Sequence, residues 1–151
     1  MGYETEAIGS GSTAMGVQTT ASGFYSTAMG FVSQASGDYS MAMGTNTKAS
    51  GINSTAMGTD TNASGLNSTA MGYETEASGV SSTAMGSNSS AKASFSTVIG
   101  KNIELTSAAS GSVFFGDASR TGSSVYSKIG ENRFYAVFDK GYLLHTNGTP
   151  G

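Results

Sequence analysis

Hydrophobic and polar positions repeat every fourteen residues along most of the chain. Each repeat carries one large apolar residue at the same phase, usually between an alanine and a glycine; this column is Met1, Met15, Met29, Met43, Met57, Met71, Met85 and Ile99. A second column, of alanines, keeps the same period and is usually followed by Ser-Gly. Self-similarity at a fixed period predicts a solenoid, in which each repeat is one structural unit that stacks on the next.

A single repeat is long enough for two short strands joined by two tight bends. Two glycines per repeat would weaken a helix by about 1 kcal/mol each, whereas a tight bend uses the positive φ or the close backbone approach that glycine permits. In the first full repeat the strands are predicted over residues 12–15 and 18–21. The predicted fold is therefore all-β, a parallel β-roll (solenoid) of 14-residue coils stacked at about 4.8 Å per coil.

Strand alternation assigns each column to the inside or the outside of the coil. Columns that vary and carry charge, such as those of Glu4 and Glu6, belong in water, and the threonine column of Thr5, Thr19, Thr47, Thr61 and Thr75 then points inward. A coil this flat has room inside for Ala, Gly, Ser and Thr only. The predicted interior contains the alanines Ala14, Ala21, Ala28, Ala35, Ala49, Ala56, Ala63, Ala70 and Ala77.

The large apolar column must then lie outside its own coil, in a nearly continuous stripe. Burying one methionine is worth about 1.5–3 kcal/mol, so a row of them in water would be an aggregation-prone ridge. We expect the stripe to bury against copies of itself around a shared axis, in a cyclic homo-oligomer. Packing alone leaves the number of chains open. The predicted axis residues are Met15, Met29, Met43, Met57, Met71, Met85, Ile99 and Phe115.

The repeat changes after Gly100. Eight residues, 101–108, precede the next Ala-Ser-Gly, where earlier repeats have four, and the strand motif returns two residues late with Phe114 at the alanine position. This predicts a wider or final coil. The domain organisation expected is head repeats over 1–116, a Ser/Gly-rich connector over 117–132, and over 133–151 a β-hairpin with arms 133–138 and 142–145, at the start of a stalk or further domain.

The motifs resemble a known family. Residues 53–58 and 67–72 (Asn-Ser-Thr-Ala-Met-Gly) and 96–100 (Ser-Thr-Val-Ile-Gly) are similar to the Ser-Val-Ala-Ile-Gly repeat of YadA-like head domains in trimeric autotransporter adhesins. The resemblance implies a left-handed β-roll, three chains around one axis (a homotrimer), and an extracellular location on a bacterial surface, a virion or a fibre. Thr-Ala-Met replaces the usual Val-Ala-Ile here.

Composition excludes several other functions. The net charge of −3 leaves no basic patch, so nucleic acid is not an expected partner. No cysteine is present to bind a metal or form a disulfide, and no apolar run is long enough to cross a membrane. His145 is the chain's one histidine and has no motif partner for catalysis. We therefore expect no enzyme activity, no catalytic residue, no cofactor, no metal and no membrane contact. The repeat phase at Met1 predicts a segment of a longer fibre.

Three functions are compatible with these features. The first is the head of a surface adhesin that attaches to a host-cell, matrix or glycan receptor through many weak contacts; its possible receptor edge is Tyr3, Phe24, Tyr25, Phe31, Tyr39 and Tyr73. The second is a segment of a phage or contractile-injection-system tail fibre. The third, an ice-binding solenoid based on the threonine column, is the weakest because that column is expected to point inward.

Overall fold

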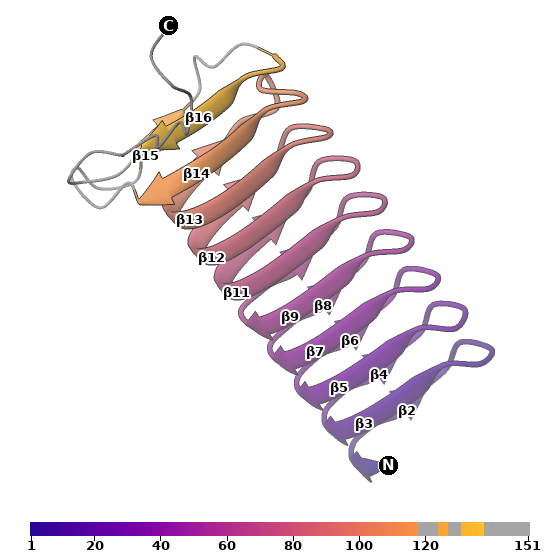
Figure 1. The fold of residues 1–151 in the computed structure, drawn as a ribbon. Helices are drawn as coiled ribbons and strands as arrows, with labels where there is room; N and C mark the ends of the chain where they lie inside the picture. The colour runs from indigo at the N-terminus through magenta and orange to yellow at the C-terminus, as the bar shows by residue number, and fades with distance from the viewer. Residues whose placement is uncertain (118–123, 127–130, 138–151) are drawn as a thin grey trace, which may run out of the picture.

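The chain folds into an elongated stack of coils (Figure 1). The structure is a computed structural model that describes residues 1–117, 124–126 and 131–137. Within these residues there is no helix, and sixteen strands pair in parallel in one continuous sheet that winds around the stack. The prediction of an all-β parallel solenoid with 14-residue coils is confirmed.

Each coil contributes one strand to each of two ladders. The first ladder carries the methionine column and comprises β1 (Gly2–Tyr3), β3 (Thr13–Val17), β5 (Thr27–Phe31), β7 (Met41–Thr45) and β9 (Thr55–Thr59). The second ladder comprises β2 (Glu6–Ala7), β4 (Thr20–Ala21), β6 (Gln34–Ala35), β8 (Lys48–Ala49) and β10 (Asn62–Ala63). Later coils run through both ladders as single strands: β11 (Thr69–Ala77), β12 (Thr83–Ala91) and β13 (Thr97–Leu105).

Neighbouring coils pair in strict register. Ala14 pairs with Ala28, and Met15 pairs with Met29. The same step of fourteen continues up to Ile99, which pairs with Met85. Every column seen in the sequence is therefore a row of side chains along the rod, one strand spacing apart.

The interior is narrow and lined by small residues. Every alanine of the predicted interior is buried, with Ala14 at 5% exposure and the others at 0%. The threonine column is also inside, with Thr19, Thr47, Thr61 and Thr75 at most 1% exposed. Some interior hydroxyls find partners within the stack: Ser26 Oγ donates to the Gly23 carbonyl oxygen at 2.8 Å. Because the threonines are buried, they offer no surface on which ice could bind.

Close coil stacking explains the glycine that follows each methionine of the axis column. A Cβ atom built on Gly58 would lie 2.0 Å from the carbonyl oxygen of Gly72 in the next coil, and the φ of Gly58 is +124°. The glycine of the Ser-Gly turn, for example Gly65, has the same close approach, at 2.0 Å from the Gly79 carbonyl oxygen, but no positive φ. In the turn, the left-handed conformation falls instead two residues later, as at Tyr25 (φ 51°).

The bend between the ladders places a second non-glycine column in the left-handed region. Its members are Glu4, Gln18, Val32, Asn46, Asp60, Glu74, Asn88 and Asn102, with φ between 50° and 56°. Several are tied to the next coil by side-chain hydrogen bonds, as from Asn88 Nδ2 to Asn102 Oδ1 at 3.0 Å. Val32 (φ 54°) is the β-branched member, and a branched Cβ is poorly suited to this conformation.

Replacing Val32 with asparagine is expected to raise the free energy of unfolding by about 1 kcal/mol, because asparagine tolerates the left-handed region better than valine does. The denaturant midpoint measured by circular dichroism checks this. Gln18→Asn, at the same position of the preceding coil, is the control and should change the midpoint much less. Equal shifts in the two variants would contradict the argument from β-branching.

Parallel pairing continues beyond residue 116, where the repeat motif ends. β14 (Val113–Asp117) pairs with β13, and β15 (Ser124–Tyr126), within the segment expected to be a connector, pairs with the second-ladder part of β13. β16 (Phe134–Val137) pairs in parallel with β14, so the coil of Phe114 is not the last layer. The hairpin's first arm contains β16; its turn and its second arm lie outside the described residues.

The lengthened coil has a physical cause in its interior. Ile103 and Leu105 take the buried positions of Ser89 and Ala91, and Phe114 takes that of Val98. The two extra residues lie after Leu105, in the turn before Ala109. Larger interior side chains widen the coil, and the regular spacing disappears from the sequence. The Phe114 ring then stacks on Tyr135 of the next layer, with ring centroids 6.0 Å apart.

Candidate functional site: the outer surfaces of the roll

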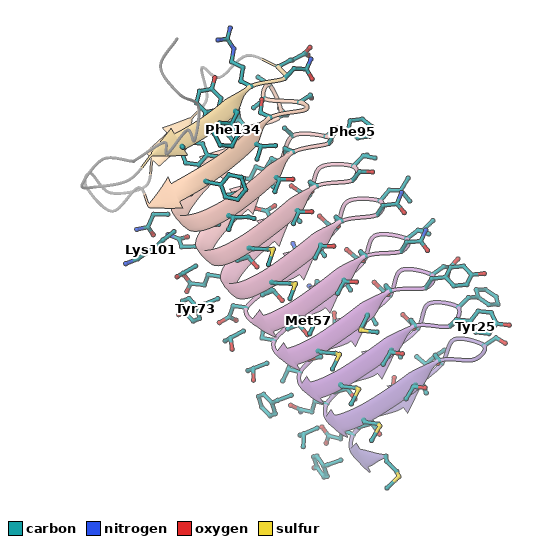
Figure 2. All side chains as sticks on the ribbon, viewed as in Figure 1. Tyr25, Met57, Tyr73, Phe95, Lys101 and Phe134 are labelled. Atoms are coloured by element: carbon teal, nitrogen blue, oxygen red, sulfur yellow. The ribbon has the colours of Figure 1, made fainter. Side chains whose placement is uncertain are left out.

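Lys101 stands at the end of the first-ladder part of β13, but the two outward columns before it carry no charge, and we call them the methionine face. It consists of the outward columns Thr13, Thr27, Met41, Thr55, Thr69, Thr83, Thr97 and Val113, and Met1, Met15, Met29, Met43, Met57, Met71, Met85, Ile99 and Phe115. Figure 2 shows the sulfur atoms in a line along the rod, past the labelled Met57. All eight methionines of the chain belong to this face.

The methionine face is partly exposed in the single chain. Met15 and Met41 are 40% and 39% exposed, and the members from Met29 to Phe115 in the axis column are half-buried. Because the columns are in register, each side chain packs beside its equivalents in the coils above and below, about 4.8 Å away. What remains open to solvent is a long apolar strip, which monomeric soluble proteins rarely display.

A second apolar surface, the turn edge, is formed by the residues that follow the Ser-Gly turn. Its exposed members are Phe24, Tyr25, Tyr39, Ile52, Leu66, Val80 and Phe95, from 40% exposure at Val80 to 67% at Phe95. The rings of Tyr25 and Tyr39 stack, with centroids 5.7 Å apart and planes at 13°. The prediction from the sequence omitted Phe95. It occupies the same phase as Tyr25 and Tyr39, which was the signal that could have found it.

The six residues predicted as a receptor edge lie on two separate edges. Phe24, Tyr25 and Tyr39 are on the turn edge, whereas Tyr3, Phe31 and Tyr73 lie at the bend between the ladders, where each is at least 50% exposed. Figure 2 shows Tyr25 and Tyr73 on opposite edges of the roll. The two groups stand at different phases of the repeat, so the sequence already assigned them to different columns. The hydrogen bond to Glu74 raises the pKa of the Tyr73 hydroxyl above its ordinary value.

The outward positions of the second ladder form a polar face. They are Glu6, Thr20, Gln34, Lys48, Asn62, Glu76, Ser90 and Glu104. Near its end Lys92 Nζ lies 2.8 Å from Glu104 Oε1 and 3.8 Å from Glu76 Oε2. The hydrogen bond to Glu104 raises the pKa of Lys92. These groups border a shallow polar depression of about 180 Å³.

The described part of the chain contains no cluster of three His, Cys, Asp or Glu side chains that could hold a metal ion. Among the same residues, no helix is long and apolar enough to cross a bilayer. The notable features of the described residues are surfaces: one uncharged face, one polar face and two edges with exposed aromatic side chains.

Stacked parallel coils with a strict sequence period define a repeat protein of the β-solenoid class. The family model of the YadA head domain repeat matches residues 7–33, 21–47, 49–75 and 77–102, which together make up more than half of the chain. The chain belongs to this family, and membership points to an adhesive fibre segment of the trimeric autotransporter adhesin type. No curated protein matches the chain.

Proposed function

We propose that this chain is the head segment of a homotrimeric surface adhesin, in which the methionine faces of three copies meet at one axis. The observation that carries the proposal is the contrast between the two outer faces. From Thr13 to Phe115 the methionine face has no charged side chain, whereas the polar face carries Glu6, Lys48, Glu76 and Glu104.

Energetics favour the methionine face as the contact surface. Each methionine that becomes fully buried contributes up to about 1.5–3 kcal/mol, reduced here because the side chains already cover one another. The polar face would have to desolvate carboxylates and an ammonium group, at a cost of several kcal/mol per unpaired ion. A cyclic arrangement covers the stripe of every copy in the same way, and family membership favours three copies.

The remaining surfaces of such a trimer suit attachment. The turn edge repeats an exposed apolar or aromatic group in successive coils, and three copies multiply each of these groups by three. Linked weak sites raise the overall affinity without any single strong site. This supports adhesion by multivalent contact with host cells or their matrix, on the outside of a bacterium.

Purified, fluorescently labelled protein tests the proposal in two stages. Sedimentation equilibrium should first give about three times the 15.2 kDa of one chain. The trimer should then be retained on epithelial cells or reconstituted extracellular matrix about tenfold or more better than a dissociated variant at equal chain concentration.

Two results would count against the proposal. A soluble monomer would remove the shared axis. A trimer that is retained by bacterial cells, and by neither epithelial cells nor matrix, would favour the alternative role in a phage or injection-system tail fibre.

A further inference from the structure

Methionine is the dominant oxidisable side chain of this protein. The chain has eight methionines and neither cysteine nor tryptophan. A methionine thioether reacts with hydrogen peroxide by a two-electron oxidation: the O–O bond breaks, one oxygen bonds to sulfur as a sulfoxide, and the other leaves as water. Methionine sulfoxide is polar, and methionine sulfoxide reductases return it to the thioether.

The methionine side chains are all on one outer surface of the roll, so their oxidation would change that surface. All eight lie on the methionine face, and none lies in the roll interior, which holds mainly Ala, Ser and Thr up to Ser96 and larger apolar residues after it. Oxidation would therefore leave the packing inside each coil unchanged. It would alter the surface that, under the proposed function, is buried between copies.

A sulfoxide has no suitable partner along its own column. Its oxygen accepts hydrogen bonds and donates none, and the neighbours of Met57 in register are Met43 and Met71. When these are oxidised too, the column becomes a row of acceptors about 4.8 Å apart with no donor between them. The outward threonine hydroxyls beside this column can donate only one hydrogen bond each, and Met41 replaces the threonine next to Met43, so burying the sulfoxides remains costly and an oxidised face should stay in water.

We propose that the methionine face is an oxidation site that controls assembly, and that peroxide-type oxidants are its reagent. The inference rests on the proposed homotrimer. In the unassembled chain the thioethers reach solvent, as the 40% exposure of Met15 shows, and oxidation there blocks association. In the assembled rod the same atoms are covered, and they react slowly.

Ile99 shows which substitution would make the axis column resistant to oxidation. Ile99 pairs in register with Met85 and occupies the same outward position, but it has no sulfur. A variant with isoleucine in place of Met15, Met29, Met43, Met57, Met71 and Met85, and with threonine in place of Met41 as in the neighbouring coils, keeps an uncharged face, and isoleucine suits a strand. It is the matched control.

The experiment oxidises the unfolded chain and then asks whether it assembles. The protein is treated with hydrogen peroxide in denaturant, checked by mass spectrometry for a gain of about 16 Da per sulfoxide, and refolded by dilution. Unoxidised protein should sediment as a trimer. Oxidised protein should show the same circular dichroism but sediment as a monomer, with at least a tenfold rise in the concentration needed for half assembly. Enzymatic reduction of the sulfoxides should restore the trimer, and the isoleucine variant should assemble after peroxide treatment.

Each contrary outcome has a separate meaning. If unoxidised protein is monomeric, the proposed function fails. If unoxidised and oxidised proteins are equally trimeric, only the inference about oxidation fails. If the oxidised chain does not fold while the treated isoleucine variant does, oxidation acts on the coil itself, and control at the assembly surface is overturned.

A second measurement tests protection in the folded rod. Peptide mapping during peroxide treatment should show Met15, which is 40% exposed in the single chain, oxidised at least tenfold more slowly in the native trimer than in a dissociated variant. Equal rates in the two proteins would overturn the proposed protection.

Discussion

Replacing Gly58 with alanine is expected to destroy the regular stacking of the coils. The added Cβ would lie 2.0 Å from the Gly72 carbonyl oxygen and 2.9 Å from its carbonyl carbon, distances that no rotamer change can relieve because both atoms belong to the backbone. The φ of +124° at Gly58 adds a conformation that alanine strongly disfavours. We expect a loss of more than about 3 kcal/mol of stability. Loss of the cooperative transition in thermal circular dichroism, together with poor soluble yield, is the measurement.

The chain supplies a control for this substitution. Ala93 occupies the turn column in which Gly65 and Gly79 stand, and the following coil has a turn two residues longer, so the column accepts a methyl group there. Ala93→Gly should therefore cost no more than about 1 kcal/mol, mainly from chain entropy. If the Gly58→Ala variant were as stable as the Ala93→Gly variant, the spacing between coils would not require glycine at position 58.

Replacing Met43, Met57 and Met71 together with aspartate is expected to convert the assembly into monomers. Three carboxylates per chain would face their equivalents across the axis, and each buried unpaired charge costs several kcal/mol. Because these side chains lie outside their coils, the solenoid itself should persist, with an unchanged circular dichroism spectrum. Sedimentation equilibrium should fall to the 15.2 kDa of one chain.

The matched control places the same change in charge on the polar face. Gln34→Asp combined with Lys48→Asp alters the net charge by the same amount, at two exposed positions of the second ladder. This variant should remain trimeric. If both variants dissociate, total charge and not the methionine face controls assembly, and if neither dissociates, the methionine face is not the interface.

Much of the fold is predictable from the sequence because the coil is thin. A 14-residue turn has two short strands, and an interior of that width accepts little beyond Ala, Ser, Thr and Gly, so residue size and alternation separate inside from outside column by column. This is why Ala21, Thr19 and Met57 could be placed without coordinates.

The same reasoning fails where the interior widens. Ile103 and Leu105 are larger than the residues they replace, the turn after them lengthens, and the period that marks a coil is lost. β15 and β16 then join the sheet by parallel pairing, with Tyr135 of β16 stacked on Phe114, but their spacing no longer follows the 14-residue pattern of the sequence.

The sequence by itself determined the parallel solenoid, the alanine interior and the outward methionine column, because each follows from a local rule of size and alternation repeated in every coil. Only the tertiary structure decided that the extra residues lie in the turn after Leu105 and that pairing continues past residue 116. It also decided which corner residues, such as Val32 and Tyr25, take the left-handed conformation. These features depend on how one coil lies on the next, and that geometry is set by backbone contacts across the stack, which side-chain periodicity does not encode.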